Sequence, residues 1–231
     1  MQNKRMMFLG AVLLSLSLLI SGCGAAEEDH GGHEAAPATS ETKPAESKPA
    51  ATNPGDPNGT YTIVPDQSST SFEVKEVFLV DSLNATAVGK TSGIKGDLIL
   101  ENGSFKPSTV VVDVTTLKTD QAMRDRQLKN RAIETDKYKT AEYTIEGVEG
   151  AINLADGKEA SFKLKGLATI HGVQKPLVWD ATAKLEGDTL KLDATVTFDM
   201  ALFEIEPPNV AGRIRVDETV TLNVSFVAKK G

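Results

Sequence analysis

Histidine, cysteine and paired carboxylates carry most enzyme catalysis, and this 231-residue chain has only three histidines and one cysteine. Only His171 lies in the part of the sequence that is patterned like a folded domain. A Ser-His-Asp or Cys-His arrangement is therefore possible only through His171. No zinc-ligand spacing, phosphate-binding loop or nucleotide fingerprint appears. The sequence predicts a protein that is not an enzyme and has no cofactor, although carboxylate-only catalysis stays open because 32 acidic residues always offer pairs.

Cys23 offers a different chemistry, the covalent attachment of lipid. Lys4 and Arg5 precede a mostly apolar run that is short for a membrane span and is typical of an export signal. The run ends at Ile20-Ser21-Gly22-Cys23, which resembles the lipobox of bacterial lipoproteins, where the cysteine is lipidated and becomes the first residue. We therefore predict a signal peptide over residues 1–22 and a fatty-acylated (palmitate-type) Cys23. The alternative is a plain secretory signal with a chance cysteine.

A lipidated Cys23 would anchor the protein to a membrane by its lipid. The predicted location is the cell membrane or the outer membrane, on the exported side, in the periplasm or at the cell surface. From residue 24 to residue 59 nothing is more apolar than alanine, and half of the ten prolines lie there. Such a segment cannot bury enough surface to offset the entropy of ordering it, so residues 23–59 predict a lipidated N-terminus with a disordered tether.

His30 and His33 lie inside that tether with acidic residues around them. This small group could hold a metal loosely, but its spacing matches no ordered site. The alternative, which we favour, is a solvated tether. We predict no metal site.

The net charge of −7 argues against nucleic acid as a partner. No basic patch and no run of interleaved basic and aromatic residues appears.

Glu76 is the polar residue in the most unusual setting. It shares the side-chain parity of Phe72, Val74 and Phe78, so an unbroken strand would point its carboxylate into an apolar face. A buried, unpaired carboxylate is costly and usually acquires a raised pKa or a partner. One candidate role is to bind the polar end of a ligand at a cavity mouth. The alternatives are a bulge that returns Glu76 to water, or pairing with a cation such as Arg124.

Strands must position these side chains. Residues 161–170 and 177–186 alternate apolar and polar side chains, with a break over His171 to Lys175, so they predict an antiparallel hairpin. Six further segments alternate in the same way, at about 61–65, 72–80, 94–100, 110–114, 190–198 and 214–226, and 143–145 predicts a short strand. Residues 120–132 lack this period and predict a short helix, capped by Thr119 or Asp120.

The fold class predicted from these elements is all-β, an extended eight-stranded antiparallel barrel of the lipocalin type with one short helix. It occupies residues 60–230. A barrel of eight strands is either filled by side chains or holds one small ligand. Its predicted inner face includes small residues such as Gly96, Gly166, Ala168 and Ala183. These residues leave room for a thin apolar ligand, or they fit the taper of a filled barrel, and the sequence does not decide between the two.

Several motifs, taken in order, resemble the YceI-like family. The segment from Gly166 to Leu177 is similar to the family's G-x-L-T-I-x-G-V-T-K-P-V hairpin, and Arg124-Asp125 with Leu128-Lys129 is similar to its R-D-x-H-L-K helix. Phe72-Glu73-Val74 resembles its F-x-V-x-H strand. Glu76 stands where the family often has histidine. The resemblance covers about residues 60–228.

The resemblance implies a lipocalin-like barrel that binds a polyisoprenoid or a similar chain lipid in its interior. It favours a real cavity over a filled barrel. Arg124 would then belong to a polar rim, or to an ion pair that only orients the helix. Trp179 would line the pocket or belong to the ordinary core. The candidate ligand-binding residues are Phe72, Val74, Glu76, Phe78, Leu98, Arg124, Leu128, Phe162, Leu164, Ala168, Trp179, Ala183 and Phe198.

The function predicted from the sequence is a membrane-anchored, extracytoplasmic binding protein that carries or sequesters an isoprenoid or fatty-acid-like chain lipid. Two other classes stay open: a ligand-free interaction or stress-response module, and a carboxylate-dependent enzyme. A homodimer also stays open.

Overall fold

The computed structural model describes residues 56–80, 83–150, 152–154, 157–210 and 212–231. The predicted signal peptide, Cys23 and residues 24–55 of the predicted tether, with His30 and His33, lie outside the described residues. Within the described ranges, no helix is long and apolar enough to cross a membrane.

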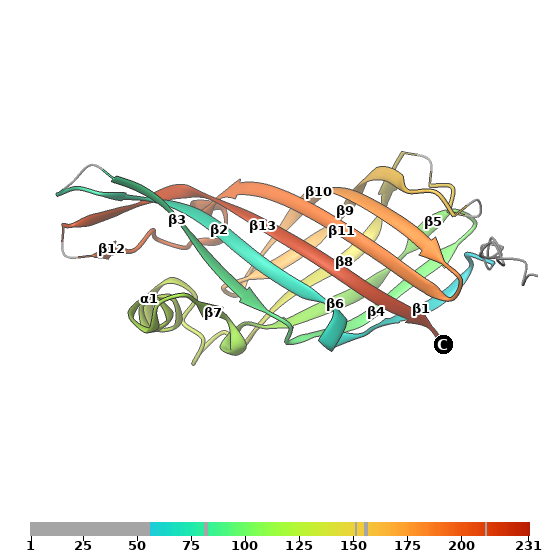
Figure 1. The fold of residues 1–231 in the computed structure, drawn as a ribbon, viewed down its shortest axis with the longest axis horizontal. Helices are drawn as coiled ribbons and strands as arrows, with labels where there is room; N and C mark the ends of the chain where they lie inside the picture. The colour runs from blue at the N-terminus through green and yellow to red at the C-terminus, as the bar shows by residue number, and fades with distance from the viewer. Residues whose placement is uncertain (1–55, 81–82, 151, 155–156, 211) are drawn as a thin grey trace, which may run out of the picture. The chain divides into compact units, whose positions relative to one another are not determined.

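Eight antiparallel strands close into a barrel, which confirms the predicted fold class (Figure 1). The closing contact pairs the first strand with the last, through Tyr61 with Lys230 and Ile63 with Ala228. The ring consists, in order, of β1 (Gly59–Ile63), β4 (Ile94–Glu101), β6 (Ser108–Asp113), β8 (Thr140–Glu149), β9 (Ala160–Ile170), β10 (Val173–Glu186), β11 (Thr189–Asp199) and β13 (Ile214–Lys230).

Outer strands extend the wall of the barrel beyond this ring. After β1 the chain turns through a 3₁₀ turn, η1 (Pro65–Gln67), and β2 (Ser69–Phe78) continues along the same edge of β13. β3 (Leu83–Thr91) then pairs with β2. The far end of the β2–β3 hairpin and the start of β13 project at one end of the barrel, while β1 and the C-terminus lie at the other (Figure 1). The short strands β5 (Ser104–Lys106), β7 (Lys118–Thr119) and β12 (Asn209–Val210) pair with β4, β3 and β13.

β3 was not predicted, because its inner face carries small residues that give little apolar contrast. Gly89 is one of them, and it lies opposite Phe72 in the register of β2 and β3. A side chain at Gly89 would meet the Phe72 ring at 2.2 Å. The aromatic ring of one strand therefore covers the glycine of the next, an arrangement that stabilises glycine positions in sheets.

The central hairpin forms as predicted, with a tighter turn. Only His171 and Gly172 connect β9 to β10, and β10 already begins at Val173. Both connecting residues have positive φ, 53° for His171 and 76° for Gly172. Two successive left-handed residues are typical of the type I′ turn, which matches the twist of a hairpin.

The predicted helix over 120–132 consists of two parts. α1 (Ala122–Gln127) is α-helical, and η3 (Leu128–Ala132) continues as a π-turn, with the Ile133 N–H donating to the Leu128 carbonyl at 2.8 Å. The predicted cap is wrong: Gln121 occupies the N-cap and makes no side-chain bond there. Thr119 instead donates from its backbone N–H and its hydroxyl to Asp125, at 2.7 and 2.8 Å.

The interior of the barrel differs between its two ends. Near β1 it is filled by large side chains that are almost fully buried, among them Tyr61, Leu98, Phe105 and Leu190. The Phe105 and Phe162 rings lie there with their centroids 5.6 Å apart. We call this region the packed end. The other end, towards α1, is hollow and holds the candidate site.

Candidate functional site: an apolar cavity with a buried ion pair

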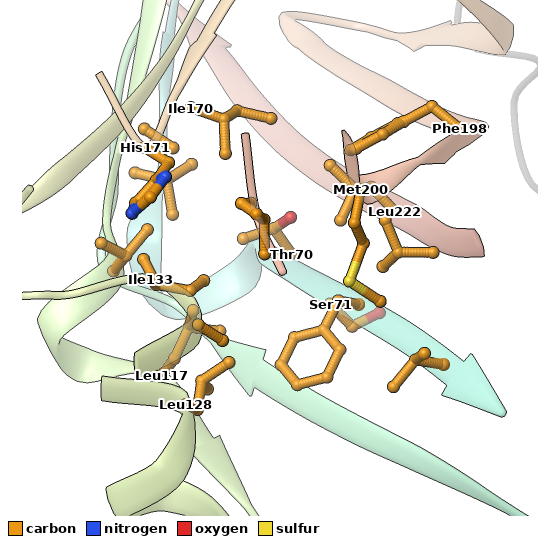
Figure 2. A pocket seen from close by; sticks show the side chains of 18 of the residues that line it. Thr70, Ser71, Leu117, Leu128, Ile133, Ile170, His171, Phe198, Met200 and Leu222 are labelled. Carbon is orange, nitrogen blue, oxygen red and sulfur yellow. The ribbon is translucent and has the colours of Figure 1, made fainter. Parts of the chain in front are cut away.

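A cavity of about 270 Å³ occupies the hollow end. Figure 2 shows Leu117, Leu128 and Ile133 on one side of it and Phe198, Met200 and Leu222 on the other. The first three come from the segment that holds α1 and from the 3₁₀ turn η2 (Val114–Thr116) with its flank, and Met200 begins another 3₁₀ turn, η4 (Met200–Phe203). A dry cavity of about 150 Å³ already admits benzene, so this space admits part of an apolar chain.

Ten of the thirteen predicted ligand-binding residues line the cavity. Eight of them lie on strands, where alternating parity turns their side chains inward, and the other two, Arg124 and Leu128, lie in α1 and η3. They are Phe72, Val74, Glu76, Phe78, Arg124, Leu128, Leu164, Ala168, Trp179 and Phe198. That they contact a ligand stays a prediction.

The other three, Leu98, Phe162 and Ala183, do not line this cavity. Leu98 pairs with Tyr61 across β4 and β1, and Phe162 packs on Phe105. Ala183 lies between Ala160 and Leu192 on the neighbouring strands. All three belong to the packed end, because side-chain parity says which face a residue lies on but not how far along the barrel it lies.

The glycines on the inner face do not create the empty space of the cavity. A side chain at Gly166 would meet the Thr144 carbonyl at 2.1 Å, and one at Gly96 would meet the Thr109 carbonyl at 2.5 Å. Neighbouring backbone therefore occupies that space. Ala168 and Ala194 do line the cavity.

Other lining residues are missing from the predicted set. Ile170, Ala194 and Leu222 have the inward parity and were not selected. Leu117 and Ile133 lie in the irregular segment around α1, where no period marks a side chain as facing inward.

Glu76 and Arg124 form a bidentate ion pair in the wall of the cavity. The Arg124 Nη2 donates to Oε2 of Glu76 at 2.9 Å, and the Arg124 Nε donates to Oε1 at 3.2 Å. Only 8% of the Glu76 side chain and 17% of the Arg124 side chain are exposed. Pairing with Arg124 was one of the alternatives for Glu76, and it is the one that the structure shows. The bulge that would return Glu76 to water is absent, because β2 keeps its register from Glu76 to Phe78.

The surroundings of Arg124 favour its charged form. The hydrogen bond to Glu76 raises the pKa of Arg124 more than burial lowers it. Arg124 also donates to Asp120, one turn earlier. The pair therefore fastens α1 to β2 beside the cavity.

A second contact fastens the segment that follows η3. The His171 Nε2 lies 2.8 Å from Oε2 of Glu134, and its ring packs edge-on against Tyr138 at 4.6 Å between centroids. Glu134 has a left-handed backbone, with φ of 50°. The segment from α1 to Tyr138, which covers one side of the cavity, is thus held at both of its ends.

Tyr143 and Trp179 form an aromatic pair in the wall, with centroids 5.7 Å apart. The Tyr143 hydroxyl lies 3.1 Å from the carbonyls of both Leu164 and Leu177. Burial, and then the nearby Glu146 charge, raise the pKa of Tyr143. The Nε1 of Trp179 is buried and has no hydrogen-bond partner among the described residues.

Among the described residues, no group of three or more histidine, cysteine and acidic side chains could hold a metal ion.

Comparison with known proteins gives a family and a fold. The model of the YceI-like domain matches residues 61–228. Among solved structures, BcnA of Burkholderia cenocepacia is similar with a TM-score of 0.59 at 13% identity, covering 72% of this chain and 99% of that one. A polyisoprenoid-binding domain from Saccharophagus degradans gives 0.59 at 15% identity, covering 74% and 98%. The YCEI protein of Campylobacter jejuni gives 0.52 at 18% identity, covering 62% and 84%. No curated protein matches the sequence.

Proposed function

This chain belongs to the YceI-like domain family, and from that premise we propose that it binds a polyisoprenoid or a similar chain lipid inside its barrel. The observation that carries the proposal is the hollow end, a cavity of about 270 Å³ walled mainly by aliphatic and aromatic side chains. Apolar clefts of this kind, with a few placed polar groups, are typical of ligand sites. The similarity in fold to the polyisoprenoid-binding domain from Saccharophagus degradans is consistent with this ligand class.

The polar groups of the wall favour an amphiphile over a plain hydrocarbon. Trp179 Nε1 is a buried donor without a partner among the described residues, and such a group costs free energy unless a ligand supplies an acceptor. The Glu76–Arg124 pair adds further donors and acceptors near the α1 side. A ligand with an apolar chain and a polar end would use both kinds of surface.

The size of the cavity limits how the ligand enters. Typical ligand pockets measure about 300–1,000 Å³, so this one lies at the small end of that range. A long chain would fill it and extend past α1, where the lining residues Gln121 and Met123 are exposed. Loading of a long lipid would then involve movement of the segment that holds α1.

We also propose that the barrel is held at a membrane on the exported side by a lipid on Cys23. The support is the lipobox-like end of the N-terminal apolar run, followed by the polar residues up to 59. An anchored carrier would hold its ligand close to the membrane that contains it.

Extraction of the purified full-length chain with organic solvent, followed by mass spectrometry, tests the proposed ligand. We expect one class of chain lipid, and we expect Ala194→Trp, which fills the cavity, to remove most of it. The matched control is Thr195→Trp, because Thr195 is the next residue on β11 and is exposed. If all three proteins carry the same lipid content, the lipid lies outside the cavity. If none carries lipid, the ligand-free interaction module is the better description.

A further inference from the structure

We infer that the protein docks on an anionic lipid bilayer through a basic surface beside the mouth of the cavity. The basic surface consists of Lys90 on β3, Lys118 on β7, Arg126 on α1, and Lys129 and Arg131 in η3. This inference rests on the proposed function, because a carrier of a membrane lipid has to meet the bilayer. It adds the surface through which the protein does so.

The segment that holds α1 is positively charged on an acidic chain. Residues 118–139 contain seven lysines and arginines and four acidic residues, which gives a net charge of +3, whereas the whole chain has −7. Arg126 and Arg131 are exposed and Lys129 is half-buried. None of the three forms an ion pair with a residue that the structure describes. Their charges are therefore available to an anionic partner.

Two lysines of the neighbouring strands face each other. Lys90 and Lys118 are directly opposite in the antiparallel register of β3 and β7, and both are exposed. Like charges in this position destabilise a sheet, and an anionic group beside them would relieve the repulsion. β7 lies against α1, where the Thr119 N–H donates to Asp125 at 2.7 Å (Figure 1). The lysine pair thus continues the row of cations on α1 and η3.

The two acidic residues closest to these cations are engaged with other groups. Asp120 accepts from Arg124, which it shares with Glu76. Asp125 accepts from the backbone N–H and the hydroxyl of Thr119, and only 15% of its side chain is exposed. Neither carboxylate therefore cancels the charge of the exposed arginines.

The other acidic residues of this region face away from the basic surface. Glu73, on the outer face of β2, accepts from Asn223 on β13, and β13 lies on the side of β2 that is opposite to β3. Glu134 contacts His171 in the β9–β10 turn. Further acids around the cavity lie towards that turn and η4, and they are Asp136, Glu142, Glu204 and Glu206.

The basic surface borders the mouth of the cavity. Gln121 and Met123 line the cavity and are exposed, with an exposed fraction of 59% for Met123. Met123 lies three residues before Arg126, so the two side chains are neighbours on α1. An apolar side chain that inserts, beside cations that meet the headgroups, is the composition of an interfacial membrane contact.

The position of the mouth favours a bilayer over other anionic occupants. An acidic protein would also complement the charge, and so would residues 24–59 of this chain, which contain seven acids and two lysines. Either of these would cover the mouth through which the ligand passes. A bilayer instead supplies the chain lipid at the place where it enters.

The predicted anchor is long enough for this orientation, although the described chain starts at the packed end. Residues 23–58 could span at most roughly 120–130 Å when fully extended. The 17 residues of β13 span about 56 Å. A lipid on Cys23 therefore allows the basic surface to reach the membrane to which the chain is anchored.

Site-specific photo-crosslinking of the full-length chain tests the inference. A benzophenone amino acid replaces Asn130, which is exposed and does not line the cavity, and in a second protein it replaces Asp188, in the β10–β11 turn at the packed end. Both proteins are reconstituted in phosphatidylcholine vesicles with and without phosphatidylglycerol. We expect several-fold more phospholipid adduct at position 130 than at position 188, and a further increase with phosphatidylglycerol.

Charge variants show whether the basic surface causes that increase. Arg126→Gln/Arg131→Gln, combined with the probe at position 130, should lose most of it. The matched control is Lys191→Gln/Lys229→Gln, which removes two exposed cations at the packed end and should keep it. The two double variants change the net charge equally, so only the position of the lost charges differs.

Equal adducts at positions 130 and 188, or an increase that survives Arg126→Gln/Arg131→Gln, would overturn the inference. Adducts at position 130 only with another protein, or only with residues 24–59, would overturn it as well. Lipid extracted from the purified protein separates this result from the proposed function. If the protein retains lipid and position 130 shows no preference, only the docking surface is wrong. If it holds no lipid and position 130 still crosslinks to anionic vesicles, the cavity proposal fails and the docking surface stands.

Discussion

Glu76 and Arg124 place two charges inside an otherwise apolar wall, where each depends on the other. Removing one partner of a buried pair leaves an uncompensated charge and costs about 3–5 kcal/mol, whereas replacing both by apolar groups is often neutral. Asp120 also contacts Arg124, so loss of Glu76 is partly compensated and loss of Arg124 is not.

We expect Arg124→Met to lower the free energy of unfolding by about 3 kcal/mol, because Glu76 loses its cation. The double variant Glu76→Leu/Arg124→Met should recover most of this loss. Urea unfolding of lipid-free protein measures both. Equal instability of the single and double variants would mean that the pair is not coupled. Lipid content of the stable double variant then shows whether the pair also binds the ligand: retained lipid would assign the pair a structural role.

Because of Tyr143, the stability of the folded protein should depend on pH in the alkaline range. Its pKa is raised in the folded state, so its neutral form contributes stability that is complete below the ordinary tyrosine pKa of about 10 and is lost as the pH rises through the folded value. We expect the parent to lose thermal stability more steeply than Tyr143→Phe between about pH 9 and about pH 11. Tyr61, whose pKa is also raised by burial, stays in both proteins and serves as the internal reference. Parallel pH profiles would contradict the expectation.

At the scale of elements, the two ends of the barrel are filled to different degrees. Ala168 on β9 lines the cavity, and Ala183 on β10 lies in the packed end. The two residues share type, burial and strand environment, so they form a matched pair.

Ala168→Phe should leave the stability of lipid-free protein nearly unchanged, because its ring enters free space. Ala183→Phe should lower it by about 1–3 kcal/mol, the usual cost of overpacking a filled core. Thermal and urea unfolding of both proteins measure the difference. If Ala168→Phe is as costly as Ala183→Phe, the cavity closes in solution.

Sequence reasoning succeeded for elements whose two faces differ in polarity and failed where they do not. Alternation in β2, β9, β10, β11 and β13 predicted the barrel and the inward parity of Glu76 and Trp179. β3 was not predicted, because its inner face carries small residues. Leu117 and Ile133 were not predicted to line the cavity, because the segment around α1 has no alternation of apolar and polar residues. Leu98, Phe162 and Ala183 were placed on the correct face, but their depth along the barrel depends on long-range packing that no local pattern contains.

In the molecule as a whole, the predicted lipid anchor and the cavity have separate roles: the anchor would hold the protein at a membrane, and the cavity would bind the ligand. Two acyl chains or more hold a protein firmly at a membrane, whereas one holds it only marginally. Cys23 is the only cysteine in the chain, so fatty acid bound through a cysteine has a single possible position.

We expect Cys23→Ala to abolish the incorporation of a labelled fatty acid in growing cells and to block normal processing. Gel analysis after metabolic labelling measures both, and Ser21→Ala, which keeps the cysteine, is the control. Label that persists in Cys23→Ala would contradict lipidation at this residue. An uncleaved apolar segment could still hold some Cys23→Ala protein at the membrane, so labelling rather than fractionation decides.

The packed end and the hollow end should differ in the free energy that is needed to open them. β13 runs through both, with Ala228 fully buried near β1 and Val216 at the cavity. Amide hydrogens of one strand would then exchange with solvent by two routes: those near Ala228 only when the whole domain unfolds, and those near Val216 through a partial opening of much lower free energy. Native-state exchange would show this as two groups of rates along a single strand. The hollow end could thus open for a lipid while the rest of the domain stays folded.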